Sequence, residues 1–170
     1  MKLKPSKIND HDFWGMLKSR NLIFNREKFI NSKKIKLYDH LIWWFNNNRE
    51  NFFFETYNNE KIYFWQKKIN IKKKKFYIGG WWSNKKKVNL LMVVYALRWQ
   101  LKLNKKNSKN YDWIAVVKRN NSSVKKLTNF LGYRNVSKNN DYYEIIKDTF
   151  NVSHKKYYYL YLNNNINSNF

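Results

Sequence analysis

Three histidines, His11, His40 and His154, lie far apart in the sequence with no acidic cluster at metal-ligand spacing around them. Because a zinc site needs several ligands brought together, this pattern predicts no metal site. The chain has no cysteine, which excludes a thiol nucleophile, a thiolate ligand and disulfide bonds. An imidazole or a carboxylate can still take a proton from a substrate, so general acid–base chemistry stays open. We interpret His11 and His154 as surface residues.

A run of three lysines, Lys85, Lys86 and Lys87, comes directly before the longest apolar segment, residues 88–103. That segment is expected to be a helix. Cations at a helix N-terminus oppose the macrodipole by a few tenths of a kcal/mol each unless an anion lies among them. Two interpretations remain open: the lysines bind an anion, or they form a solvated turn.

The net charge of +24 favours anionic partners such as nucleic acid, acidic membrane or phosphorylated small molecules. However, only six basic residues are arginines, and lysine comes with a similar excess of Asn, Ile, Phe and Tyr. Codon drift in an AT-rich genome would produce that mixture. A base-reading protein would be expected to use more arginine. The charge therefore predicts only non-specific attraction to nucleic acid, and it leaves function and drift both open.

The 170 residues, 43% of them hydrophobic, correspond to one domain with a real core. One domain is expected over residues 1–162, followed by a disordered polar tail over residues 163–170. The start has no apolar leader region, and no apolar run approaches about 18 residues. A cytoplasmic protein without a membrane span is the expectation, and the oligomeric state stays open.

Apolar spacing predicts a mixed α/β (α+β) chain. Helices are expected over residues 9–19, from a cap at Asn31 or Ser32 to about Phe45, and over residues 88–103 and 122–131. Strands are expected over residues 52–56, 62–66, 76–82, 113–117, 142–146 and 156–162. Three consecutive strands and a later strand–helix–strand crossover predict a mixed, mostly antiparallel central sheet flanked by helices.

The segment from Trp113 to Tyr133 contains a buried strand, then Asn121, then a helix that ends in Leu-Gly-aromatic. Gly132 and Tyr133 lie eleven and twelve positions after Asn121. On these residues the chain resembles the second half of an acetyltransferase of the GNAT (GCN-related N-acetyltransferase) superfamily. The resemblance implies the GNAT acyltransferase fold over nearly the whole chain, with acetyl-CoA or a related acyl-CoA as cosubstrate.

The N-terminal segment carries a second, weaker resemblance. Its residues are Asp12, the pair Arg20-Asn21, and His40 followed by Trp43-Trp44-Phe45. They are similar to the opening of bacterial GNAT enzymes that acetylate amino groups on nucleotide-linked sugars. This resemblance implies an amino sugar or a nucleotide sugar as the acceptor.

In the GNAT family, the strand before the central helix splays from the next strand, and the CoA pyrophosphate lies on N–H groups at the start of that helix. The resemblance places the splayed strands at residues 76–82 and 113–117. The implied cofactor-binding residues are Trp82, Ser83, Asn84, Lys85, Lys86, Lys87, Val88 and Asn121. The loop departs from the family pattern because it has no glycine, so the lysines would have to bind the phosphates by charge.

Three residues are catalytic candidates. His40 matches a family histidine ahead of a Trp-Phe pair and is the first candidate for the base that takes the amine proton, while a structural role for this isolated histidine stays open. Glu55, on a strand that faces the presumed acceptor side, is the second candidate. Many members have a tyrosine acid seven residues after the motif asparagine, and Thr128 occupies that position here. A threonine hydroxyl is a poor acid. Three alternatives stay open: another group protonates the thiolate, the thiolate leaves with solvent help, or activity has been lost.

Two tryptophan pairs, Trp43-Trp44 and Trp81-Trp82, either line an acceptor pocket or belong to the core. The pair Gly79-Gly80 on a predicted strand is typical of a bulge or a close backbone approach. Three functions follow. The first is acetyl transfer from acetyl-CoA to a primary amine of a small molecule. The second is a GNAT-shaped binding module without catalysis. The third is a basic nucleic-acid-binding protein, against which the absence of a base-reading motif counts.

Overall fold

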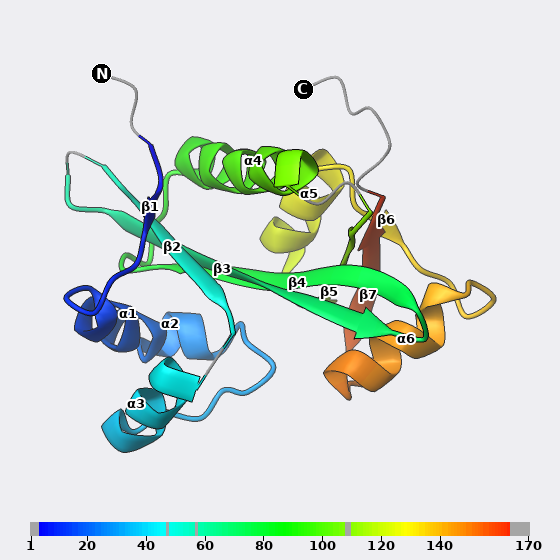
Figure 1. Ribbon diagram of the computed structural model, residues 1–170, viewed down its shortest axis with the longest axis horizontal. Helices are drawn as coiled ribbons and strands as arrows, with labels where there is room; N and C mark the ends of the chain where they lie inside the picture. Colours follow the sequence, from blue (N-terminus) through cyan, green and yellow to red (C-terminus); the bar gives the residue numbers. More distant parts are fainter. Residues whose placement is uncertain (1–3, 47, 57, 108–109, 164–170) are drawn as a thin grey trace. The chain divides into compact units, whose positions relative to one another are not determined.

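The computed structural model describes residues 4–46, 48–56, 58–107 and 110–163 (Figure 1). Its helices are α1 (Phe13–Arg20), α2 (Ile23–Arg26), α3 (Leu37–Asn46), α4 (Leu90–Asn107), α5 (Ser122–Phe130) and α6 (Tyr142–Phe150). Its strands are β1 (Ser6–Lys7), β2 (Glu50–Glu55), β3 (Lys61–Ile71), β4 (Lys74–Ser83), β5 (Asp112–Lys118), β6 (Arg134–Asn135) and β7 (Tyr157–Leu162). The predicted tail lies outside the described residues, apart from Asn163.

The strands follow one another in the order β1-β2-β3-β4-β5-β7-β6. The pairs β1–β2, β2–β3, β5–β7 and β6–β7 are antiparallel, whereas β4 pairs with β5 in parallel. This topology confirms the predicted mixed, mostly antiparallel α/β fold. The chain forms two compact units: unit 1 holds the described residues up to Lys67 and Gly79–Leu97, and unit 2 holds Lys68–Ile78 and those from Arg98 onward. A single domain over residues 1–162 stays a prediction.

In unit 1, the aromatic side chains of β2 and β3 alternate between the two faces of the sheet, as the strand period of two requires. Phe52 and Phe64 are register partners and stack with their ring centroids 5.4 Å apart. Phe54 meets Tyr95 of α4 at 5.3 Å. On the opposite face, one buried cluster contains Ile8, Met16, Tyr63 and Trp82. Figure 1 shows α1, α2 and α3 on that side of β2 and β3, with the start of α4 on the other.

Unit 2 is built on the antiparallel pair β5–β7, which runs from Trp113↔Leu162 to Lys118↔Tyr157. Ile114, at 0% exposure, lies in its core with Phe76, Val136, Ile145, Ile146 and Tyr159. After α5, Gly132 has φ +89, a conformation that favours glycine, and its N–H donates to Asn129 O. Gly132 therefore ends α5 in the position directly after its C-cap residue, Leu131.

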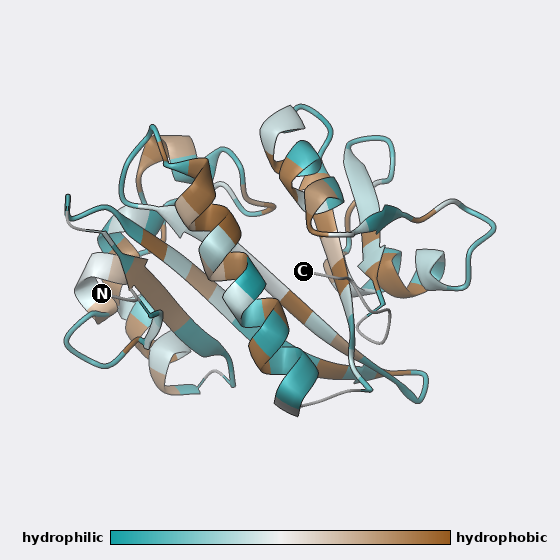
Figure 2. Cartoon of the chain, turned by 90° about the horizontal axis from the view of Figure 1, so that it is seen from above, coloured by the Kyte–Doolittle hydropathy of each residue, from teal (hydrophilic) through white to brown (hydrophobic). Residues whose placement is uncertain are grey.

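Helix α4 carries its apolar residues mainly in its first half, where Val93 and Ala96 are fully buried. Figure 2 shows this helix changing from brown at its start to teal toward its C-terminal end. Although α4 spans 18 residues, no helix in the described part of the chain is long and apolar enough to cross a membrane.

The strand predicted over residues 142–146 is wrong, because this segment forms the start of α6. Two tyrosines and two isoleucines on either side of Glu144 form a short β-prone run, which is typical of a strand. The helical period instead places Tyr142, Ile145 and Ile146 on one face, and both isoleucines are buried. Lys147 and Glu144 form an i,i+3 ion pair at 3.0 Å on the exposed side.

The helix predicted from Asn31 or Ser32 begins only at Leu37. Arg20 Nη2 donates to Asn31 O at 2.9 Å. The Asn21 side chain both donates to Ile35 O and accepts from Ile35 N, each at 2.9 Å. These bonds use backbone groups of the segment before α3 and hold it as a loop. The short elements β1, α2 and β6 were not predicted.

Candidate cosubstrate and acceptor sites

The predicted phosphate loop runs from the end of β4 to the start of α4, within unit 1. Ser83 is buried, and its Oγ accepts from Lys85 N at 3.0 Å. Asn84 is fixed to the start of β3, because its N donates to Lys61 O and its Oδ1 accepts from Lys61 N. Lys85 Nζ donates to Asn58 O at 2.8 Å. The first N–H groups of the loop therefore have partners within the chain.

Glu60 was not predicted as a site residue, yet its carboxylate lies where the central helix begins. Its Oε1 accepts from Asn89 N at 3.0 Å, and Asn89 Oδ1 accepts from Leu91 N at 3.0 Å. A negative charge at a helix N-terminus is favourable because it meets the positive end of the macrodipole. Glu60 thus supplies an internal anion at the place where the family resemblance expects a phosphate.

The other predicted cosubstrate residues have different surroundings. Lys86 and Lys87 are exposed and Val88 is half-buried. Trp82 is only 4% exposed, and its Nε1 donates to Ser19 Oγ at 2.9 Å. Its side chain is therefore part of the core. The predicted splayed strands correspond to β4 and β5, whose parallel pairing covers Phe76↔Asp112 and Tyr77↔Trp113.

Two predicted residues, Asn121 and Thr128, lie in unit 2 at α5. Asn121 caps the helix, with its Oδ1 accepting from Val124 N at 3.4 Å. The Thr128 hydroxyl donates to Lys125 O at 2.9 Å, inside its own helix. Because that hydrogen already has a partner, Thr128 is a weak proton donor for a departing thiolate.

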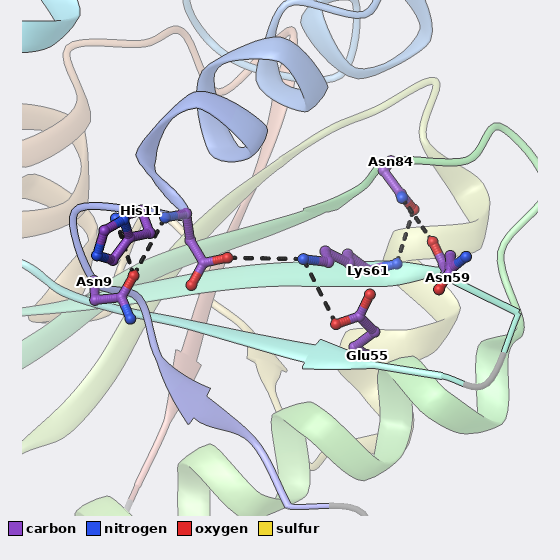
Figure 3. A network of polar contacts seen from close by, with 7 residues as sticks. Asn9, His11, Glu55, Asn59, Lys61 and Asn84 are labelled. Carbon is purple, nitrogen blue, oxygen red and sulfur yellow. Dashed lines mark hydrogen bonds and ion pairs between the residues drawn. The ribbon is translucent and has the colours of Figure 1, made fainter.

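A carboxylate–ammonium–carboxylate cluster lies in unit 1 (Figure 3). Lys61 Nζ is 3.6 Å from Glu55 Oε2 and 3.7 Å from Asp12 Oδ1. Glu55 and Lys61 meet because they are register partners of β2 and β3. Asp12 is positioned by Asn9, whose Oδ1 accepts from the Asp12 and His11 backbone N atoms. The structure thus places one predicted base, Glu55, in a charged cluster with Asp12.

Tyr63 lies beneath this cluster on the same face of β3 as Lys61. Burial raises the pKa of Tyr63 to about 12, and the charges of Asp12 and Glu55 act in the same direction. A hydrogen bond with Ser19 opposes this shift. The Tyr63 ring stacks on Trp82 at 5.8 Å, and a Cβ added to Gly15 would lie 3.0 Å from the Tyr63 hydroxyl oxygen. Tyr63 is therefore a fixed, protonated hydroxyl rather than a base.

His40 is buried in unit 1, between two aromatic rings. Its ring stacks on Phe13 at 4.8 Å and on Trp43 at 5.1 Å, and it is only 3% exposed. Its Nε2 has no hydrogen-bond partner among the described residues. Burial lowers the pKa of His40, with a hydrogen bond to the Phe13 backbone acting in the opposite direction. The imidazole is therefore held in its neutral form within the α1–α3 packing.

Replacing His40 by Phe is expected to make the free energy of unfolding less dependent on pH on the acid side of neutrality. The unfolded chain binds a proton at His40 near its usual pKa of about 6.5, whereas the folded chain resists it, so stability is lost as the pH falls below that value. At most, His40 contributes a slope of about 1.4 kcal/mol per pH unit to the free energy of unfolding, and the Phe variant loses this contribution. Urea unfolding of both proteins between pH 5 and 7.5 measures this difference in slope. Parallel curves would contradict a depressed pKa.

The paired tryptophans and glycines mostly serve packing. Trp43 and Trp44 are half-buried, and Trp44 Nε1 donates to Asp10 Oδ1 at 2.9 Å. A Cβ added to Gly80 would lie 2.9 Å from Trp65 Nε1, so the close approach expected of this glycine pair is present at Gly80.

In the described part of the chain, no His, Asp or Glu residues group as they would around a metal ion.

The fold is similar to that of solved N-acetyltransferases. Mutant forms of the spermidine/spermine N-acetyltransferase SpeG from Vibrio cholerae match with a TM-score of 0.64 at 11% identity, over 95% of each chain. The N-acetyltransferase PseH from Campylobacter jejuni matches with a TM-score of 0.56 at 15% identity, over 94% of this chain and 96% of that one. A domain from Methanocaldococcus jannaschii DSM 2661 matches with a TM-score of 0.69 at 17% identity, over 95% and 97%.

In sequence, no family model matches the chain and no curated protein matches it. The likeness therefore concerns the fold. The chain has the fold of the GNAT N-acetyltransferases, as the resemblance in its sequence implied.

Proposed function

We propose that the chain is an N-acetyltransferase that moves an acetyl group from acetyl-CoA to the primary amine of a small molecule. The observation that carries this proposal is the shared fold, which covers at least 94% of this chain in solved N-acetyltransferases. An amino sugar or a nucleotide sugar is the acceptor we expect from the N-terminal residues. Because SpeG is named for spermidine and spermine, polyamines belong in the acceptor screen.

Glu55 is the base that this proposal favours over His40. An ammonium must lose its proton before its nitrogen can attack the thioester carbonyl. The Glu55 side chain keeps 39% of its surface exposed beside Lys61. The His40 ring, in contrast, is enclosed by Phe13 and Trp43. The neutral amine nitrogen then forms the amide bond while the carbon–sulfur bond breaks, and the proton that this nitrogen loses passes through solvent to the departing CoA thiolate.

A binding module that holds CoA without turnover is the second candidate. Two observations favour it: the Thr128 hydroxyl is used within its own helix, and Glu60 already holds the N–H of Asn89. Under either function, Lys85, Lys86 and Lys87 are the exposed cations at the loop that would meet the phosphates of CoA. Bound CoA without acetylation across a broad amine panel would favour this second candidate.

Titration calorimetry of acetyl-CoA at moderate salt, with ATP as a competing polyanion, tests the cosubstrate. Saturable binding that prefers acetyl-CoA over ATP is expected. The double change Lys85→Glu/Lys86→Glu should weaken it about tenfold, since each exposed charge contact is worth about 0.2–1 kcal/mol. Lys33→Glu/Lys34→Glu changes the net charge equally elsewhere in unit 1 and should leave the affinity unchanged. Absent binding at millimolar acetyl-CoA would exclude the proposed function.

A further inference from the structure

Helix α3 has apolar side chains both on the side that packs against α1 and on the opposite, exposed side. One face packs inward in unit 1, where His40 and Trp44 meet the Phe13 ring at 4.8 and 5.7 Å. The opposite face carries Tyr38, Ile42 and Phe45, which are 71%, 46% and 74% exposed. Their spacing of four and then three residues places them in one stripe along the helix. This outer stripe is a continuous apolar surface.

A helix that is hydrophobic all round is normally buried, whereas a helix at a protein surface is polar on its outer face. The outer stripe of α3 breaks this rule over two turns. Single exposed apolar residues are ordinary on protein surfaces, but large neighbouring ones mark an interaction site. The stripe is therefore expected to be covered by a partner.

The charges beside the stripe indicate which partner. Lys33, Lys34 and Lys36 are exposed and come directly before α3, and Lys28 is exposed shortly before them. The bonds from Arg20 and Asn21 to Asn31 and Ile35 fix this basic segment next to α1. Asp39 is the acidic residue of the helix. Exposed basic residues thus lie directly before the helix that carries the apolar stripe.

A second copy of the chain fits this surface poorly, because each copy carries a net charge of +24 and the stripes would bring their lysines together. An anionic bilayer fits both features. Helices that lie in the membrane interface combine aromatic and aliphatic side chains on one face with lysine or arginine beside them. Lysines near the surface of an anionic leaflet add electrostatic attraction.

We propose that the outer face of α3 docks the protein on a bilayer surface that contains anionic lipid. Tyr38, Ile42 and Phe45 enter the interface, and Lys33, Lys34 and Lys36 meet the lipid headgroups. The helix lies on the membrane and does not cross it, in keeping with its 10-residue length. This docking is independent of acetyl transfer.

Flotation of the full chain with vesicles tests the proposal, using phosphatidylcholine alone and phosphatidylcholine with phosphatidylglycerol, at 150 mM salt. The protein is expected to float with the anionic vesicles and not with the neutral ones. Tyr38→Ser/Phe45→Ser keeps the net charge and should weaken binding at least about tenfold. Leu91→Ser, which removes another apolar side chain with 77% exposure, should bind like the wild type.

Two results would overturn the proposal. Unchanged flotation of Tyr38→Ser/Phe45→Ser would mean that general charge attraction alone holds the protein on the vesicles. A dimer in sedimentation velocity that this variant dissociates would assign the stripe to a second copy of the chain. Thermal unfolding of both variants checks that they fold like the wild type, which is expected because the changed side chains are exposed.

Discussion

Replacing Glu55 by Gln is expected to lower kcat for amine acetylation by about 10²-fold or more, the usual contribution of a general base. Gln keeps the size of the side chain but cannot take a proton. The loss should be largest below the pKa of the amine acceptor and should shrink as the pH rises, because the amine then arrives already neutral. The KM for acetyl-CoA should change little, since the phosphate loop is untouched.

Steady-state acetylation of the best amine from the screen, measured from pH 6 to 10, tests this expectation. Glu144→Gln is the matched control, because it removes a carboxylate that also pairs with a lysine, Lys147, at 3.0 Å, but on α6. An equal loss at every pH would indicate that Glu55 only positions Lys61. Full activity of Glu55→Gln would exclude it as the base and direct attention to Asp12.

Replacing Ile114 by Ala is expected to destabilise unit 2 by about 2–5 kcal/mol, the range of large-to-small changes in a packed core. Ile114 is fully buried and lies among Phe76, Val136 and Tyr159. The methyl groups removed leave a cavity that paired β5 and β7 cannot easily collapse into. This is a large fraction of the usual 5–15 kcal/mol of a folded domain.

Because the chain has two compact units, global unfolding need not be a two-state process. Amide hydrogen exchange is therefore the better measurement: protection should fall along β5 and β7 and persist in β2. Ile23→Ala is the control, since Ile23 is 63% exposed on α2 and its change should stay within about 0.5 kcal/mol. Equal loss of protection in β2 and β5 would show that the units unfold together.

Most of the fold could be predicted because its elements have clear periods. The aromatic alternation of β2 and β3 and the long apolar run of α4 each fit one period. The prediction for residues 142–146 was wrong because four β-prone residues in five suit a strand as well as a helix. Only the packing of Ile145 and Ile146 decides which of the two forms. The helix start before α3 was predicted too early because the loop there is held by the side chains of Arg20 and Asn21, which bond to its backbone from more than ten residues away.

The candidate site was predictable only within continuous segments. Asn121 and its helix follow from spacing along one stretch. The cluster of Asp12, Glu55 and Lys61 joins three segments, and its geometry depends on the β2–β3 register. A signal for it was present: the pair Asn58-Asn59, a turn signal, lies between the predicted strands 52–56 and 62–66, and a hairpin turn there would place Glu55 opposite Lys61. The bond between Glu60 and Asn89 spans 29 positions and leaves no pattern in the sequence.

That bond means that the start of α4 has a tethered competitor for any incoming phosphate. A group held on the same chain acts at an effective concentration of order millimolar or more, whatever the dilution of the protein. Under the proposed function, acetyl-CoA would have to displace this carboxylate or bind around it, which would raise the acetyl-CoA concentration needed for half-saturation. The same carboxylate protects the helix end when no cosubstrate is present. The loop thus lacks the glycines of the GNAT pattern but has an internal anion at the helix end, so the folded state of this segment depends less on a bound ligand.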